Sequence, residues 1–164
     1  MVTDHVDHVL AQWQEQRPDL DVAPMAVFGR LSRLSQLAGA ELRKNFAAHD
    51  LDAASFDVLA TLRRSATPHL TPTELMHAAM VTSGAITQRL DRLEERGLVS
   101  RSRSESDGRG VRVSLTDAGR TIVDAALPDH LATEERLLGP LTPTQRNCLA
   151  ATLRTLLESL GDST

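Results

Sequence analysis

The segment from Thr71 to Gly119 constrains the fold most, because it combines two closely spaced helix starts with two strand patterns. Its first four residues, TPTE, form a capping box with proline at the first helical position, so a short helix is expected to begin there. A second helix restarts near residues 81–84 and ends at Gly97, a residue suited to a C-terminal cap. Residues 98–103 and 111–115 alternate apolar with polar side chains, as half-buried strands do.

The second helix has one apolar face. Ile86, Leu90 and Leu93 are spaced by four and three residues, which places them together on a helix that turns by about 100° per residue. The two helices are followed by two strands whose connection, residues 104–110, is charged and glycine-rich. This order predicts a mainly α fold with a winged helix-turn-helix and a two-stranded β wing.

Further helices are expected on both sides of this unit. Val6 to Trp13 form a stripe on a short N-terminal helix, and a long helix should cover residues 23–49 with Phe28, Leu34 and Phe46 facing inward. Asp52 should cap a helix over 53–65. The last helices are expected at 117–137, kinked by Pro128, and from Thr142 to about Leu160. We predict one domain over residues 1–164, in which residues 53–116 form the winged-helix unit.

The flanking helices carry more apolar surface than one chain can cover. A symmetric dimer would bury it, and dimers suit helix-turn-helix proteins that read two half-sites about one DNA turn apart. Residues 1–50 and 117–164 are therefore predicted to be dimerisation helices. The leucines on which this rests are Leu127, Leu131, Leu137, Leu138, Leu149, Leu153, Leu156 and Leu160.

The charge distribution favours a nucleic-acid partner despite a net charge of −4. Residues 89–112 hold seven arginines against five acids, so positive charge gathers on the second helix and the wing. No run approaches the roughly 18 apolar residues of a membrane span, and the N-terminus does not resemble a signal peptide. We expect a cytoplasmic protein without a membrane partner.

The sequence lacks the residue patterns expected for an internal disulfide, a metal site or a common catalytic centre. The single cysteine, Cys148, excludes an internal disulfide, and its leucine-rich surroundings favour a packed thiol in the core or a dimer interface. The six histidines have no strong metal-ligand spacing. No Ser/His/Asp order or phosphate-binding loop is present, so we expect neither an enzyme nor a metal or cofactor.

The DNA-binding segment resembles the MarR family of bacterial transcription regulators. The resemblance rests on the string TSGAITQRLDRLEERGLV, the wing motif Asp107-x-Arg109 with the strand after it, and the helix start LTDAGR. It implies a dimer that binds double-stranded DNA at a palindromic operator. It also implies that Arg109 enters the minor groove, where narrow tracts attract guanidinium groups, and that Asp107 orients it.

The start of the second helix is where a recognition helix meets base edges and phosphates. Hydroxyl groups there can bind phosphates, Gly84 permits close approach, and Gln88 can pair with adenine. Arg92 could bind guanine or phosphate, or could belong to a solvated face with local ion pairs. The predicted DNA-binding residues are Thr82, Ser83, Gly84, Thr87, Gln88, Arg92 and Arg109.

Arg89 lies about 60° from the apolar stripe, so near the interior that it needs a partner. Trp13, Asp57, Arg89 and Arg101 together resemble the signature of the urate-responsive branch of the family, the PecS and HucR types. An indole can stack on a flat purine while two guanidinium groups hold its anionic oxygens. Asp57 would then hold Arg89 until the ligand arrives.

These observations predict a homodimeric regulator, most simply a repressor, that a small anionic aromatic effector such as urate releases from DNA. Two alternatives remain open. The effector could be a different phenol or carboxylate, or the winged helix could bind a protein partner instead of DNA. Each of the four pocket residues also has an ordinary structural role available to it, as a core anchor, an ion pair or a phosphate contact.

Overall fold

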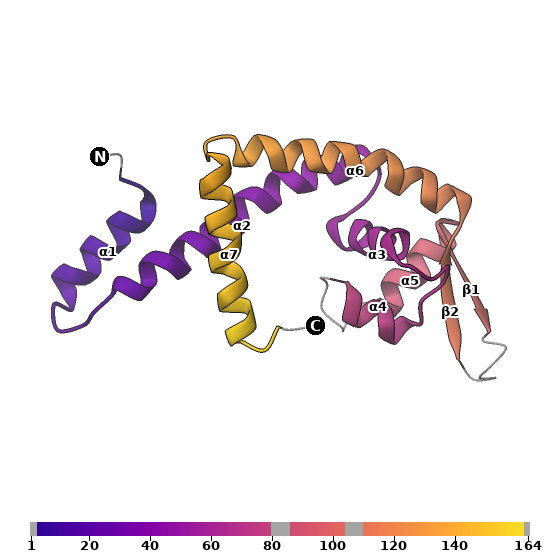
Figure 1. Ribbon diagram of the computed structural model, residues 1–164, viewed down its shortest axis with the longest axis horizontal. Coiled ribbons are helices and arrows are strands. Elements are labelled where there is room, and N and C mark those ends of the chain that lie inside the picture. The colour runs from indigo at the N-terminus through magenta and orange to yellow at the C-terminus, as the bar shows by residue number, and fades with distance from the viewer. Residues whose placement is uncertain (1–2, 80–85, 104–109, 163–164) are drawn as a thin grey trace. The chain divides into compact units, whose positions relative to one another are not determined.

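The computed structural model describes residues 3–79, 86–103 and 110–162 (Figure 1). The chain divides into two compact units, Met1–Arg43 and Lys44–Thr164. Helix α2 (Ala23–Ala48) crosses the boundary between them. The predicted mainly α fold with a two-stranded antiparallel wing is confirmed.

In the first unit, helix α1 (His5–Gln16) pairs with the first part of α2. Asp4 caps α1 in a capping box with Asp7, and Arg30 of α2 donates hydrogen bonds to both carboxylates, at 2.8 and 2.7 Å. Val6 is buried, and a Cβ atom built on Gly29 would lie 3.1 Å from its Cγ1 atom. A small residue on α2 and two acid–arginine contacts thus hold the two helices together.

The second unit contains the winged helix and the C-terminal helices. Its core gathers side chains from α3, α4, α5, both strands and the start of α6, with Leu59, Leu75 and Leu93 fully buried. The elements are α3 (Ala53–Arg64), α4 (Pro72–Ala78), α5 (Ile86–Glu95), β1 (Val99–Arg103), β2 (Val111–Leu115), α6 (Asp117–Leu138) and α7 (Pro143–Ser159).

The wing is fixed to the helices at both ends. Val99 pairs with Leu115 in the antiparallel register, and Leu70 exchanges two backbone hydrogen bonds with Val113, at 3.0 and 2.8 Å. Gly97 has a positive φ of 68°, which a glycine adopts without strain, and it turns the chain from α5 into β1. At the start of α6, a Cβ atom on Gly119 would lie 1.9 Å from the Leu98 carbonyl oxygen. Only glycine fits there.

The end of α2 packs within the second unit through aromatic rings. Phe46 stacks on Phe56 of α3 with ring centroids 4.6 Å apart, and both rings contact the imidazole of His130 on α6. Helix α6 contains Pro128 and continues through it to Leu138. This aromatic cluster joins α3 to the middle of the long helix that follows the wing.

Phe46 faces inward as predicted, but two other residues of the same stripe do not. Phe28 is 64% exposed and Leu34 is 57% exposed in the single chain. Their exposure corrects the prediction that both face inward within one chain, since a periodic apolar stripe shows that a face is apolar without showing what covers it. Cys148 is also exposed, so it is not a core thiol of the single chain.

The described residues form neither a membrane-spanning helix nor a metal-binding cluster. None of the helices is both long and apolar enough to cross a membrane. In the same residues, no group of three or more His, Cys, Asp or Glu side chains is placed to hold a metal ion.

Candidate nucleic-acid interface and its arginine contacts

Helix α5 is anchored by one face and exposes the other. Ile86, Leu90 and Leu93 are 7%, 1% and 0% exposed, which confirms the apolar face predicted from their spacing. Thr87 and Gln88, which begin the described part of the predicted DNA-reading surface, are exposed. The predicted DNA contacts Thr82, Ser83, Gly84 and Arg109, together with Asp107, lie outside the described residues.

Helix α4 is held firmly before α5. Thr71 and Glu74 form the predicted capping box, with the Thr71 N–H donating to the Glu74 carboxylate at 2.7 Å. At the other end, the guanidinium of Arg64 on α3 donates to the Ala78 carbonyl oxygen at 2.6 Å. Leu75 is fully buried between these two fixed ends. The short helix therefore has little freedom relative to α3.

One flank of α5 is acidic and binds the wing. Nη1 of Arg101, on β1, donates to Asp91 at 2.6 Å, and the backbone N–H of Arg101 donates to Glu94 at 3.0 Å. Nη2 of the same guanidinium contacts the Thr87 carbonyl oxygen at 3.3 Å. The Arg101 side chain is only 26% exposed. These contacts connect the first wing strand to helix α5 over most of the length of that helix.

The opposite flank of α5 carries arginines. Arg89, Arg92 and Arg96 line a concave site of about 410 Å³ that is closed on its other side by the end of α2 and the start of α3. Arg89 binds the carboxylate of Asp52 and approaches the Ser55 hydroxyl at 3.3 Å, and its side chain is 17% exposed. Asp52 is thus the partner that an arginine so near the interior requires.

Asp52 has two roles in this arrangement. It caps α3 by accepting a hydrogen bond from the Ser55 N–H at 2.7 Å, and it pairs with Arg89. Partial burial raises the pKa of this carboxyl, but the hydrogen bonds from the Ser55 N–H and from Arg89 outweigh burial and leave the pKa below its ordinary value. Asp52 is therefore a charged link between α3 and α5 at neutral pH.

The four residues predicted to bind an effector fall into different places. Trp13 lies on α1 in the first unit, 42% exposed beside Gln12 and Gln16. Asp57, Arg89 and Arg101 all belong to the second unit. Arg89 and Arg101 lie on opposite flanks of α5, each holding a carboxylate of the protein. Asp57 is half-buried on α3, and the carboxylate recorded on Arg89 is that of Asp52.

Two features of this site were missed by the sequence reasoning. Asp52 was expected only as a helix cap, because nothing local connects it to a residue 37 positions away. The other is Arg96, which follows Arg92 by four residues and Arg89 by seven, a helical spacing that puts all three on one flank. That spacing was the available signal.

Known proteins share this fold and much of this sequence. A family model described as the MarR family matches residues 49–110. The transcriptional regulator PecS of Dickeya dadantii is 40% identical over 149 residues, which cover 90% of each chain.

Two solved structures are similar over most of their length. Sco3205 of Streptomyces coelicolor, a MarR family regulator solved in complex with DNA, is 26% identical, with a TM-score of 0.78 over 86% of this chain and 89% of its own. BpsR of Bordetella bronchiseptica, whose DNA binding is regulated by 6-hydroxynicotinic acid, is 27% identical, with a TM-score of 0.72 over 80% of this chain and 98% of its own. The identity to PecS supports the PecS-type branch. From its sequence and its fold, the chain belongs to the MarR family of winged-helix transcriptional regulators.

Proposed function

We propose that this protein represses transcription by binding a palindromic operator as a homodimer, and that a small anionic aromatic effector releases it. The observation that carries the DNA-binding part is the geometry of α5. Its apolar face is buried while Thr87, Gln88 and Arg92 are exposed, which is how a recognition helix presents side chains to the major groove. Arg109 is proposed to bind the adjacent minor groove.

Dimerisation is supported by the apolar surface of the C-terminal helices. Seven leucines of α6 and α7 are 37–80% exposed in the single chain, more apolar surface than a monomer keeps in water. A second copy would cover it and would place two recognition helices on two half-sites. These leucines are Leu127, Leu131, Leu138, Leu149, Leu156, Leu157 and Leu160.

The effector proposal rests on Trp13, Asp57, Arg89 and Arg101 as ligand contacts. Arg89 and Arg101 supply the two guanidinium groups. Arg89 already binds the carboxylate of Asp52, and Arg101 already binds that of Asp91 on α5. An anion that binds Arg89 must compete with Asp52, and loss of that pair would free α5 from the start of α3. The ligand then acts by preferring the form of the dimer that cannot bind DNA. Urate or a related purine fits this proposal, and the identity to PecS supports it.

A second effector class has its own support. BpsR responds to 6-hydroxynicotinic acid, a hydroxylated aromatic carboxylate, and shares the fold and 27% of its residues with this chain. The same arginines could bind such a carboxylate in place of a purine anion. The two classes differ in which compound shifts the DNA equilibrium.

The test is a fluorescence-anisotropy titration. An operator is first selected from random-sequence DNA with the protein itself, and the complex is then titrated with urate, xanthine, hypoxanthine and 6-hydroxynicotinate. The effective compound should weaken binding by a coupling free energy of about 1–3 kcal/mol. If no selected sequence binds above background at low salt, the protein-interaction alternative for the winged helix would be favoured. If DNA binds but no compound at millimolar concentration changes it, the effector proposal fails alone.

Variants locate the effector site. Trp13→Ala should lose the response and keep DNA affinity, because Trp13 lies outside the unit that holds α5. Arg89→Ser should lose the response and some DNA affinity, since Arg89 also ties α5 to Asp52. Asp57→Asn should blunt the response. Arg154→Gln, an exposed arginine on α7, is the control and should leave both measurements unchanged.

A further inference from the structure

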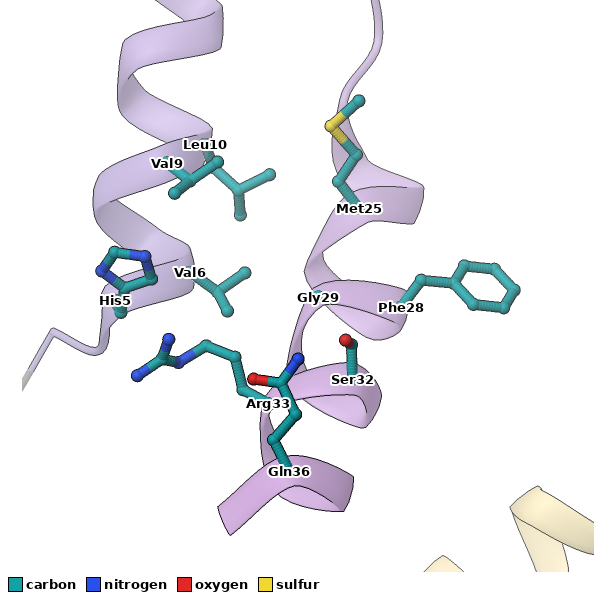
Figure 2. Close-up of a pocket in the computed structure, with 10 residues that line it drawn as sticks. All are labelled: His5, Val6, Val9, Leu10, Met25, Phe28, Gly29, Ser32, Arg33 and Gln36. Carbon is teal, nitrogen blue, oxygen red and sulfur yellow. The ribbon is translucent and has the colours of Figure 1, made fainter.

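The first unit contains a crevice between α1 and α2 that the proposed function does not use (Figure 2). It measures about 410 Å³ and lies wholly within the unit formed by residues 1–43. Its lining is His5, Val6, Val9, Leu10, Met25, Phe28, Gly29, Ser32, Arg33 and Gln36.

The crevice is apolar at one end and cationic at the other. Val9 and Leu10 of α1 and Met25 of α2 project from the two helices at one end (Figure 2). At the other end Arg33 extends from α2 toward α1, on the side where His5 lies (Figure 2). The lining contains no acidic residue. A molecule bound along the crevice would therefore meet hydrocarbon along most of its length and a positive charge at one end.

Arg33 differs from the neighbouring arginine of the same helix. Arg30 is engaged by Asp4 and Asp7 and serves to hold α1 on α2. Among the residues that the structure describes, no hydrogen bond or ion pair engages Arg33. One arginine therefore has a structural partner, whereas the other offers its donors to the crevice.

The shape of the lining favours an aliphatic ligand over an aromatic one. The side chains at the apolar end are branched aliphatic groups and a thioether, and the only aromatic ring of the lining besides His5, that of Phe28, points away from α1 (Figure 2). A flexible chain suits a crevice with this lining better than a rigid ring that has no flat partner to stack on.

We propose that this crevice binds a medium-chain aliphatic carboxylate, with its tail between Val9, Leu10 and Met25 and its carboxylate on the Arg33 guanidinium. Burial of the tail supplies the affinity, and the charge-assisted hydrogen bonds of Arg33 fix the orientation. The crevice lies on the face of α2 that carries Gly29, whereas the exposed Leu34 lies about 140° around the same helix. Phe28 lines the crevice and also belongs to the exposed apolar stripe of α2, so the two surfaces meet at this residue, whereas Leu34 lies on the stripe alone. This proposal does not depend on the proposed function.

Isothermal titration of the full-length protein with octanoate and decanoate, below the concentrations at which they form micelles, tests the proposal. Both should bind, and 1-octanol, which has the tail without the charge, should bind more weakly. Arg33→Gln should weaken binding by about tenfold or more, the effect of losing hydrogen bonds to a charged group. Met25→Glu should also weaken it, because it places a negative charge beside the tail. Arg43→Gln, an exposed arginine further along α2, is the matched control and should bind as the unmodified protein does.

Sedimentation analysis of the same variants shows whether the crevice binds an aliphatic carboxylate or is covered by a second copy of the chain. Met25 is 45% exposed, so the glutamate should be tolerated in the folded protein, and the Arg33→Gln titration stands independently of it. The proposal is overturned if neither acid binds, or if both variants bind them like the unmodified protein. If neither acid binds and Met25→Glu also alters the oligomeric mass, the occupant of the crevice is a second copy of the chain.

Discussion

At the scale of single residues, Asp52 connects stability to pH. Because hydrogen bonds hold its folded pKa below the ordinary value, its contribution to stability is present above the unfolded pKa of about 3.9 and is lost as the pH falls through the folded value. Asp52→Asn keeps an acceptor for the helix cap but removes the charge that Arg89 binds. Because the Asp52 side chain is 59% exposed, solvent screens its pair with Arg89, so the free energy of unfolding at pH 7 should fall by at most about 1 kcal/mol. The decrease in this free energy between pH 5 and 3 should become shallower.

Urea unfolding at several pH values measures this effect. Asp162→Asn, an exposed carboxyl near the C-terminus, should keep the acid dependence of the unmodified protein. Asp52→Ala should cost about 1 kcal/mol more than Asp52→Asn, since it also removes the cap. An asparagine variant with an unchanged pH profile would show that the contact with Arg89 contributes nothing to stability.

Two residues of the DNA-reading surface should differ in the kind of binding they supply. Gln88→Ala should mainly relax sequence preference, by about 1–3 kcal/mol for a lost base contact. Arg109→Ala should weaken binding to all sequences and reduce the slope of log affinity against log salt by about one. Anisotropy measured on the selected operator and on point-substituted versions, over a salt series, distinguishes the two effects. If both variants behave like the unmodified protein, α5 and the wing do not contact DNA as proposed.

At the scale of elements, the junction between the wing and α6 depends on one glycine. Gly119→Ala would push a methyl group onto the Leu98 carbonyl oxygen, a backbone atom that cannot move away cheaply. We expect a loss of more than about 3 kcal/mol of unfolding free energy, or no soluble protein. Gly39→Ala is the matched control. This helical glycine meets only the flexible end of Arg43 at 3.4 Å, so alanine there should stabilise by about 0.5–1 kcal/mol. Chemical denaturation of the two variants should give opposite signs.

At the scale of the whole molecule, the C-terminal helix is predicted to hold the dimer together. Deleting residues 142–164 removes the exposed leucines of α7, so the truncated protein should be monomeric or aggregated and should lose tight operator binding. The double variant Leu156→Glu with Leu160→Glu should do the same without shortening the chain. Arg154→Glu, at an exposed position on the opposite side of α7 from Leu156, is the control and should stay dimeric. Sedimentation equilibrium decides, and a soluble truncated dimer would refute the assignment.

Local features of the fold were predictable from the sequence. The capping boxes that begin at Thr71 and Thr142 mark helix starts in the structure as they do in the sequence. The buried face of α5 followed from the spacing of Ile86, Leu90 and Leu93, because helical geometry alone brings such residues together.

Contacts between distant segments were not predictable in this way. The pairs Arg89–Asp52 and Arg30–Asp4 join residues 37 and 26 positions apart, and no periodicity encodes which of several carboxylates an arginine will meet. The stripe on α2 shows the same limit, since Phe46 is covered within the chain whereas Phe28 is not. Periodicity identifies a face, and tertiary packing decides its partner.

The contacts of Arg101 have a consequence for the kind of DNA that the protein can bind. Since Asp91, Glu94 and the Thr87 carbonyl oxygen fasten β1 to α5, the wing and the recognition helix form one stiff body. On the proposed binding mode, that body spans a fixed interval from the major groove to the neighbouring minor groove. An operator that has the correct bases but an altered twist or groove width would therefore have to be deformed before α5 and the wing could both enter their grooves. The base pairs between the two grooves would then influence affinity through how easily they deform.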